Sequence, residues 1–336
     1  MALPTNSRSL LGLEDALKVR VFFALPNLWS AIALRMTCHK LNDIYRHHET
    51  SIRNGCRDKL VAAVDDYYKF LTTLYVNEPT VHHPPTGGWP DIPLEKSNRR
   101  DKDFVVDVAR RLPYITGDCG LGDGICALHS YKIEHNCVPL DYSSGFHRCD
   151  NNGRLQSTLT DSAKHSAEHC IELARACRRE GHYLYLDTMT GVIIDDVVGM
   201  AQQQQHDQGT TYYKQIVAYF EERKENFRAL TYVAAGHNIY EAEEGEADDF
   251  KFMDPDSVRT NLSDWEKLDY EPYARLLGQK ERFPGKLDLA WVCRLYRKFG
   301  WPGPDYQKQE ALKAVRDYYE HRLGSSAPMC FELHYP

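Results

Sequence analysis

The chain has 336 residues and a net charge of −7, with 42% hydrophobic and 26% charged residues, which is typical of a globular protein. This balance gives no basic footprint, and no apolar run approaches the roughly 18 residues of a membrane span, so we expect neither nucleic-acid nor membrane partners. Charges interrupt residues 13–20, where a signal peptide would be apolar. The ten cysteines lack the spacing of a secreted scaffold. Together these features predict an intracellular protein, cytoplasmic or nuclear, with reduced thiols.

The first predicted elements are three short helices between residues 13 and 52. An apolar stripe recurs every four residues and consists of Leu13, Leu17, Val21 and Leu25. Pro26 ends that helix, and later stripes contain Leu28, Ile32 and Met36, then Leu41, Ile44 and Tyr45. Each helix is too short to be stable alone, so the stripes must be buried within the module and against a partner.

The same segment resembles a divergent F-box. The similarity rests on residues 24–30 (ALPNLWS), 33–42 (ALRMTCHKLN), 44–46 (IYR) and 48–49 (HE). The segment is most similar to the F-box-like N-terminal segments of large, mostly uncharacterised fungal families. Gly12-Leu13-Glu14 stands where an F-box usually starts with Leu-Pro. The resemblance implies docking on the Skp adaptor of a cullin-type ubiquitin ligase. The candidate partner-binding residues are Leu17, Val21, Leu25, Pro26, Leu28 and Ile32. The alternative is a helical subdomain packed on its own chain.

Further helices and a long loop follow the N-terminal module. Apolar spacing predicts helices over 54–77 and 101–112, and the proline- and glycine-rich residues 78–98 predict a loop at a domain boundary. Residues 116–158 are expected to be mostly loop. The predicted division is an F-box-like module at 1–52, a connecting helix at 53–80, a central α+β body at 81–250 and a helical C-terminal portion at 251–336.

The second half of the chain alternates helix and strand signals. Asp161 predicts the cap of a helix that reaches Glu180, and 182–194 alternates around a turn at 188–191 as a β-hairpin does. Another amphipathic helix is predicted over 212–230. Residues 285–324 are expected to form an αα-hairpin, with Trp291 mostly buried in its core.

One motif suggests metal chemistry. His165-Ser166-Ala167-Glu168-His169 matches the H-x-x-E-H signature, in which both imidazoles bind zinc from one helix face and the glutamate is the general base. Glu246 lies at about the spacing along the sequence at which such proteases have their third ligand. The surrounding sequence does not otherwise resemble such proteases, so we expect a half-exposed helix with outward histidines at this motif and no bound zinc.

A second possible metal region lies between residues 116 and 150. It contains Cys119, Cys126, Cys137 and Cys149 with His129, His135 and His147. No cysteine pair has the knuckle spacing of a zinc finger, so we predict free thiols and no bound metal. Asp195 and Asp196 follow the hairpin and are expected at a solvated strand end, although such a pair could bind a cation.

These observations predict an α+β, mainly helical fold and a non-enzymatic adaptor that recruits an unknown target protein to a cullin-type ligase. No catalytic residue and no cofactor is assigned. Two alternatives remain: a zinc-dependent hydrolase that uses His165, Glu168 and His169, and a scaffold protein without ligase contact. An adaptor should leave part of its N-terminal apolar surface exposed, whereas a hydrolase needs its ligands to converge.

Overall fold

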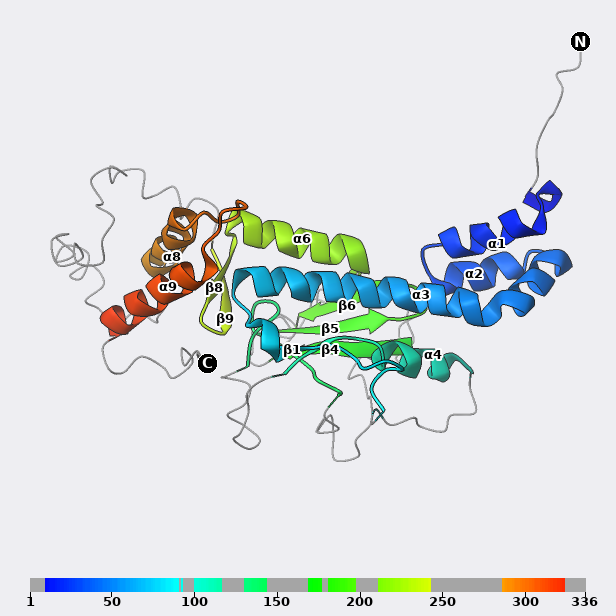
Figure 1. Cartoon of the computed structure of the whole chain (residues 1–336), viewed down its shortest axis with the longest axis horizontal. Helices are drawn as coiled ribbons and strands as arrows, with labels where there is room; N and C mark the ends of the chain where they lie inside the picture. The colour runs from blue at the N-terminus through cyan, green and yellow to red at the C-terminus, as the bar shows by residue number, and fades with distance from the viewer. Residues whose placement is uncertain are drawn as a thin grey trace, which may run out of the picture. The chain divides into compact units, whose positions relative to one another are not determined.

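The computed structural model describes residues 10–90, 92, 100–116, 130–143, 169–176, 181–197, 211–242 and 286–323. This part of the chain has a mixed α/β fold with seven α-helices and several sheets, and about 53% of it is helical (Figure 1). Contacts divide the chain into two compact units, Met1–Thr72 with Asn77–Glu222 and Thr73–Val76 with Arg223–Pro336. Among the described residues, no helix is both long and apolar enough to cross a membrane.

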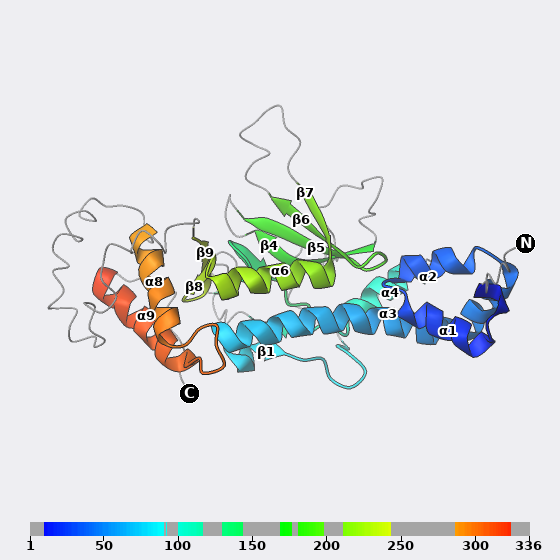
Figure 2. The same cartoon turned by 90° about the horizontal axis from the view of Figure 1, so that it is seen from above.

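The first unit begins with three helices. They are α1 (Asp15–Ala24), α2 (Leu28–Arg35) and α3 (His39–Leu74), after a short 3-10 helix at Leu10–Gly12. Figure 2 shows α1 and α2 beside the N-terminal part of α3. The predicted break at Leu25-Pro26 is confirmed, and the Asn27 Oδ1 atom caps α2 by accepting a bond from the Ser30 amide at 2.8 Å. These helices enclose a core of Phe22, Ala31, Leu41, Ile44, Tyr45 and Ile52.

The third helix is longer than predicted. It is continuous across residue 52, where the sequence placed a domain boundary, so the two helices expected near 41–45 and 54–77 are one. Gly55 lies inside this helix, and a Cβ at its position would approach the Phe23 ring at 3.2 Å. The glycine therefore makes room for α1 to pack closely, and this packing offsets its low helix propensity.

The buried face of α1 differs from the predicted stripe. Lys18 and Phe22 are fully buried, whereas Leu17 is 42% exposed. The Lys18 ammonium donates to the Asp15 carboxylate at 2.9 Å, which pairs the charge while the aliphatic stem is buried. The inward face is therefore rotated by one residue, because a lysine stem takes a position that a hydropathy pattern assigns to solvent.

A five-stranded antiparallel sheet forms the centre of the first unit. Its order is β3 (Cys137–Pro139), β4 (Cys170–Ala176), β5 (His182–Asp187), β6 (Val192–Val197) and β7 (Thr211–Gln215). Helix α6 (Ile216–Ala229) lies beside α3 next to this sheet (Figures 1 and 2). The Tyr67 ring of α3 stacks on Phe220 of α6 at 4.5 Å, so an aromatic contact joins the two helices.

The sheet confirms one prediction and corrects two. The hairpin over 182–194 is present as β5 and β6, with its turn at Thr188–Gly191. The helix predicted from Asp161 to Glu180 is wrong over Cys170–Ala176, which forms β4, because pairing on both sides overrides the helix propensity of its residues. The helix predicted from residue 212 begins at Ile216, since the preceding residues pair with β6.

A smaller substructure completes the described part of this unit. Strands β1 (Val81–His82) and β2 (Tyr114–Ile115) pair, and α4 (Arg100–Ala109) lies between them in sequence. A guanidinium–carboxylate pair, Arg57 to Asp107 at 2.8 Å, attaches α4 to α3. The helix predicted over 101–112 is thus confirmed in position and ends three residues early.

The second unit contains a β-hairpin and an αα-hairpin. Strands β8 (Tyr232–Ala235) and β9 (Asn238–Glu241) form the former, which the sequence did not predict. Helices α8 (Lys286–Lys298) and α9 (Lys308–Leu323) confirm the latter.

The burial predicted for Trp291 of α8 is confirmed. Trp291 is mostly buried and stacks on Tyr318 with ring centroids 6.2 Å apart, and Tyr296 is fully buried and donates to the Ala234 carbonyl at 2.8 Å. The inward face of α8 is centred near Val292 and Tyr296 and contains Leu295 at its edge.

Candidate functional site

Exposed apolar side chains are concentrated on the N-terminal helices. Four of the seven large hydrophobic residues exposed in the described part of the chain lie between residues 17 and 36: Leu17, Phe23, Trp29 and Met36. Trp29 is 57% exposed and Met36 is 77% exposed. Single exposed apolar residues are common, but a local excess that includes tryptophan makes these helices a candidate interaction surface.

Helix α2 presents its exposed residues as a stripe. Trp29, Ile32, Ala33 and Met36 follow the i, i+3, i+4, i+7 spacing that places residues on one helix face. Ile32 is half-buried and the other three are exposed. We call these four residues the α2 stripe. Trp29 was not among the predicted partner-binding residues, although its seven-residue separation from Met36 was a usable signal.

The six predicted partner-binding residues differ in accessibility. Leu17 and Pro26 are exposed, and Val21, Leu25 and Ile32 are half-buried. Leu25 also packs against the helical core of this module. Leu28 is completely buried, so it contributes to packing within the chain and offers no surface to a partner.

The start of α2 is attached to the turn between β5 and β6. The Asn27 amide donates to the Thr190 carbonyl at 2.8 Å, and the Trp29 backbone amide donates to the Met189 carbonyl at 2.9 Å. Gly191 in this turn has a φ of 67°, a conformation that glycine adopts without strain. The α2 stripe is therefore held on a hydrogen-bonded support.

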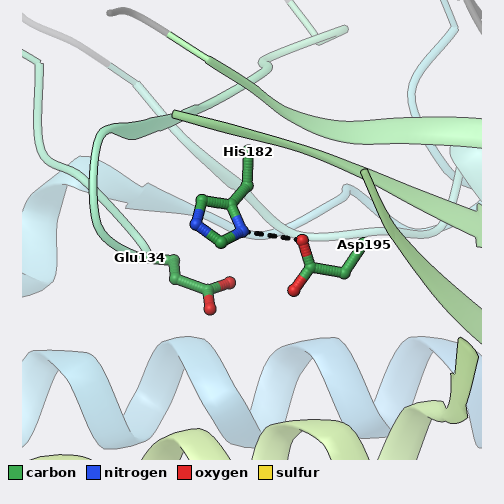
Figure 3. Close-up of side chains that lie close together, drawn as sticks. All are labelled: Glu134, His182 and Asp195. Carbon is green, nitrogen blue, oxygen red and sulfur yellow. Dashed lines mark hydrogen bonds and ion pairs between the residues drawn. The ribbon is translucent and has the colours of Figure 1, made fainter. Parts of the chain in front are cut away.

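A second candidate is a polar cluster of the buried Glu134 and Asp195 with the half-buried His182 (Figure 3). Glu134 precedes β3, His182 begins β5 and Asp195 lies within β6. Asp195 pairs directly with Leu184, two residues after His182, so the two polar residues are diagonal neighbours on one face of the hairpin. The His182 Nδ1 and Asp195 Oδ1 atoms are 2.8 Å apart.

Tyr219 of α6 connects the two carboxylates of the cluster. Its hydroxyl lies 2.5 Å from the Glu134 Oε2 atom and 3.0 Å from the Asp195 Oδ2 atom. Both carboxylate residues are 1% exposed. Burial of two carboxylates beside one hydroxyl costs free energy unless positive charge or shared protons compensate their negative charge.

The cluster corrects the prediction for Asp195. The sequence placed this residue at a solvated strand end, whereas the structure buries it and leaves Asp196 half-buried. The alternative that this pair could bind a cation remains open for Asp195. Glu134 and His182 were not identified as site residues, because the three positions are brought together only by strand pairing and by the segment that enters β3.

The predicted zinc motif falls mostly outside the described residues, as do His165, Glu168 and Glu246. His169 is described and half-buried, and its carbonyl accepts bonds from the Thr188 amide and hydroxyl at 3.0 and 2.9 Å. Strand β4 follows it directly. The long helix on which both imidazoles were expected to share a face is therefore not formed after His169.

The cysteine-rich region is described only in part. Cys119, Cys126, Cys149, His129 and His147 lie outside the described residues. Cys137 is buried, and its thiol donates to the His135 and His182 carbonyls at 3.4 and 3.1 Å. His135 is half-buried. The Cys137 side chain therefore takes part in backbone hydrogen bonding at the edge of β3.

Comparison with models of known protein families, with curated proteins and with solved structures finds no match to this chain.

Proposed function

We propose that this chain is a non-enzymatic adaptor that binds a partner protein through helices α1 and α2. The observation that carries the proposal is the exposed α2 stripe, which places Trp29 and Met36 on one face at high exposure. Tryptophan is enriched among the residues that dominate binding energy, and methionine adapts to irregular partner surfaces. Leu17 adds an exposed apolar residue on α1.

The proposed partner is the Skp adaptor of a cullin-type ubiquitin ligase, with the rest of the chain recruiting an unknown target protein. The F-box resemblance of residues 24–49 supports this choice of partner. The attachment of α2 to the β5–β6 turn supports the mode of binding, because a surface held in place loses less conformational entropy when it binds.

The structure changes which residues should carry the binding energy. Leu28 is buried in its own chain, so a charge at that position would unfold the module and would not test binding separately. Trp29 and Met36 are exposed, and their removal should leave the free energy of unfolding almost unchanged. They replace Leu28 as the preferred positions for mutation.

The experiment is a direct titration of the purified full chain with a purified Skp adaptor. We expect saturable binding that weakens by about 30-fold or more in the Trp29→Ala, Met36→Ala double variant, which corresponds to about 2 kcal/mol for an interface hot spot. Val217→Ala is the matched control, since Val217 is 60% exposed on α6. Absence of binding by the unmodified chain would remove the ligase connection, and equal loss in both variants would reject the α2 stripe.

A further inference from the structure

We propose that Glu134, His182 and Asp195 form a binding site for one divalent transition-metal ion of the zinc type. The three residues come from separate segments of the chain, yet their potential ligand atoms all lie within 4.8 Å of one another. Figure 3 shows the Glu134 carboxylate turned toward the space beside the His182 and Asp195 side chains. This convergence is independent of the α2 stripe and of the adaptor proposal.

The ligand chemistry selects the class of ion. One imidazole nitrogen and two carboxylate oxygens suit Zn²⁺ and similar divalent ions, whereas Ca²⁺ and Mg²⁺ prefer all-oxygen sets. In tetrahedral zinc coordination, bonds of about 2.0–2.2 Å place neighbouring ligand atoms roughly 3.4 Å apart. The separation of 2.8 Å between His182 Nδ1 and Asp195 Oδ1 lies below this spacing and the 4.8 Å limit lies above it. Small side-chain movements therefore suffice for coordination.

The electrostatics of the cluster favour a cation. Glu134 and Asp195 are almost completely buried, and both approach the Tyr219 hydroxyl, which has a single proton to donate. A divalent ion is bound most strongly by carboxylate oxygens in such a site of low polarity, where its charge is the largest local one.

The competing arrangement is a metal-free network. In that arrangement His182 is bonded to Asp195 through Nδ1, and the Tyr219 hydroxyl joins the two carboxylates. A bound ion takes the place of the His182–Asp195 hydrogen bond, because the same nitrogen and oxygen become ligands. Both arrangements connect the segment before β3 with β5 and β6, so the ion has a structural role and stabilises the first unit.

The test begins with the full chain stripped of metal by a chelator and dialysed, then titrated with Zn²⁺ alone. Isothermal calorimetry should give one ion per chain, and zinc should raise the Tm of the first thermal transition. Glu134→Gln and His182→Gln should each weaken binding by at least tenfold and abolish the rise in Tm. Asp196→Asn is the matched control, because Asp196 is adjacent to Asp195 but on the other face of β6.

Cobalt spectroscopy keeps the test decisive if a variant does not fold. Co²⁺ bound to the unmodified chain should show visible d–d bands of nitrogen and oxygen ligands without a thiolate-to-cobalt charge-transfer band. Charge transfer from thiolate would place the ion on cysteines and overturn the proposal. Absence of stoichiometric Zn²⁺ binding, or binding retained in both glutamine variants, would leave the metal-free hydrogen-bond network as the correct description.

Discussion

Two regions of the first unit depart from the usual pattern of apolar residues inside and polar residues outside, each in a different way. The N-terminal helices expose apolar side chains such as Trp29, and the Glu134–His182–Asp195 cluster buries polar ones beside the sheet. Charged side chains in the interior cost stability unless they are paired or hydrogen-bonded, whereas exposed apolar side chains gain free energy when a partner covers them. We therefore propose a protein partner for the first region and a metal ion for the second.

The largest expected change in stability is the difference between substitutions on the buried and exposed faces of α1. Phe22→Ala should lower the free energy of unfolding by about 3–5 kcal/mol, since Phe22 is fully buried and packs edge-to-face on Tyr45 at 5.8 Å. Leu17→Ala, on the predicted stripe, should cost less than about 1 kcal/mol. Urea unfolding of both variants is the measurement. A larger cost for Leu17 would mean that the original stripe faces the core.

The next effect concerns the polar region. Tyr219→Phe removes the hydroxyl that both carboxylates approach and should destabilise the chain by about 1–3 kcal/mol, because it leaves buried acceptors without that donor. Tyr212→Phe serves as a control, since Tyr212 is exposed on β7, and it should change stability by less than about 0.5 kcal/mol. Equal unfolding midpoints for Tyr219→Phe and the unmodified chain would show that the hydroxyl is dispensable to the cluster.

The N-terminal helices were predictable from sequence to a useful degree, and the polar cluster was not. Pro26 and the apolar spacing located α1 and α2, because these signals act over one or two helical turns. The direction of burial was less predictable: Lys18 occupies a core position through its stem, and Tyr296, which was not predicted to face inward, is fully buried on α8. Helix propensity and spacing contain no information about which neighbouring element will cover a face.

The sheet and the cluster depend on contacts between distant segments. Strand β4 has the composition of a helix and is a strand because β3 and β5 pair with it. Glu134 and Asp195 are 61 residues apart, and their proximity follows from that pairing and from the position of α6. The predicted absence of metal was based on two motifs elsewhere, so it did not consider these three residues together.

A third prediction tests the attachment of α2 to the turn between β5 and β6. Asn27→Ala removes both the cap of α2 and the bond to the Thr190 carbonyl, and it should cost about 1–2 kcal/mol in unfolding free energy. Asn27→Ser retains a capping oxygen and loses only the amide donor, so it should cost less. If Asn27→Ser is as destabilising as Asn27→Ala, the attachment to the turn contributes more than the cap. If both variants equal the unmodified chain, the Asn27 side chain contributes nothing to the cap or to the attachment of α2.

The smallest effect is a pH dependence on the N-terminal helices. Hydrogen bonds from Lys18 and then Lys40 lower the pKa of the Asp15 carboxyl below its ordinary value of 3.8. A carboxyl with a lower pKa in the folded state stabilises the fold above the unfolded pKa, and this contribution disappears as pH falls through the folded value. The unmodified chain should therefore be slightly more stable than Asp15→Asn at pH 7, and the difference should close below about pH 4. Thermal unfolding of both proteins across this range, in low salt because Asp15 is exposed, measures the effect. A gap that persists unchanged at acid pH would mean that Asp15 acts through its polarity at the start of α1, and that its charge pairs with Lys18 and Lys40 contribute nothing.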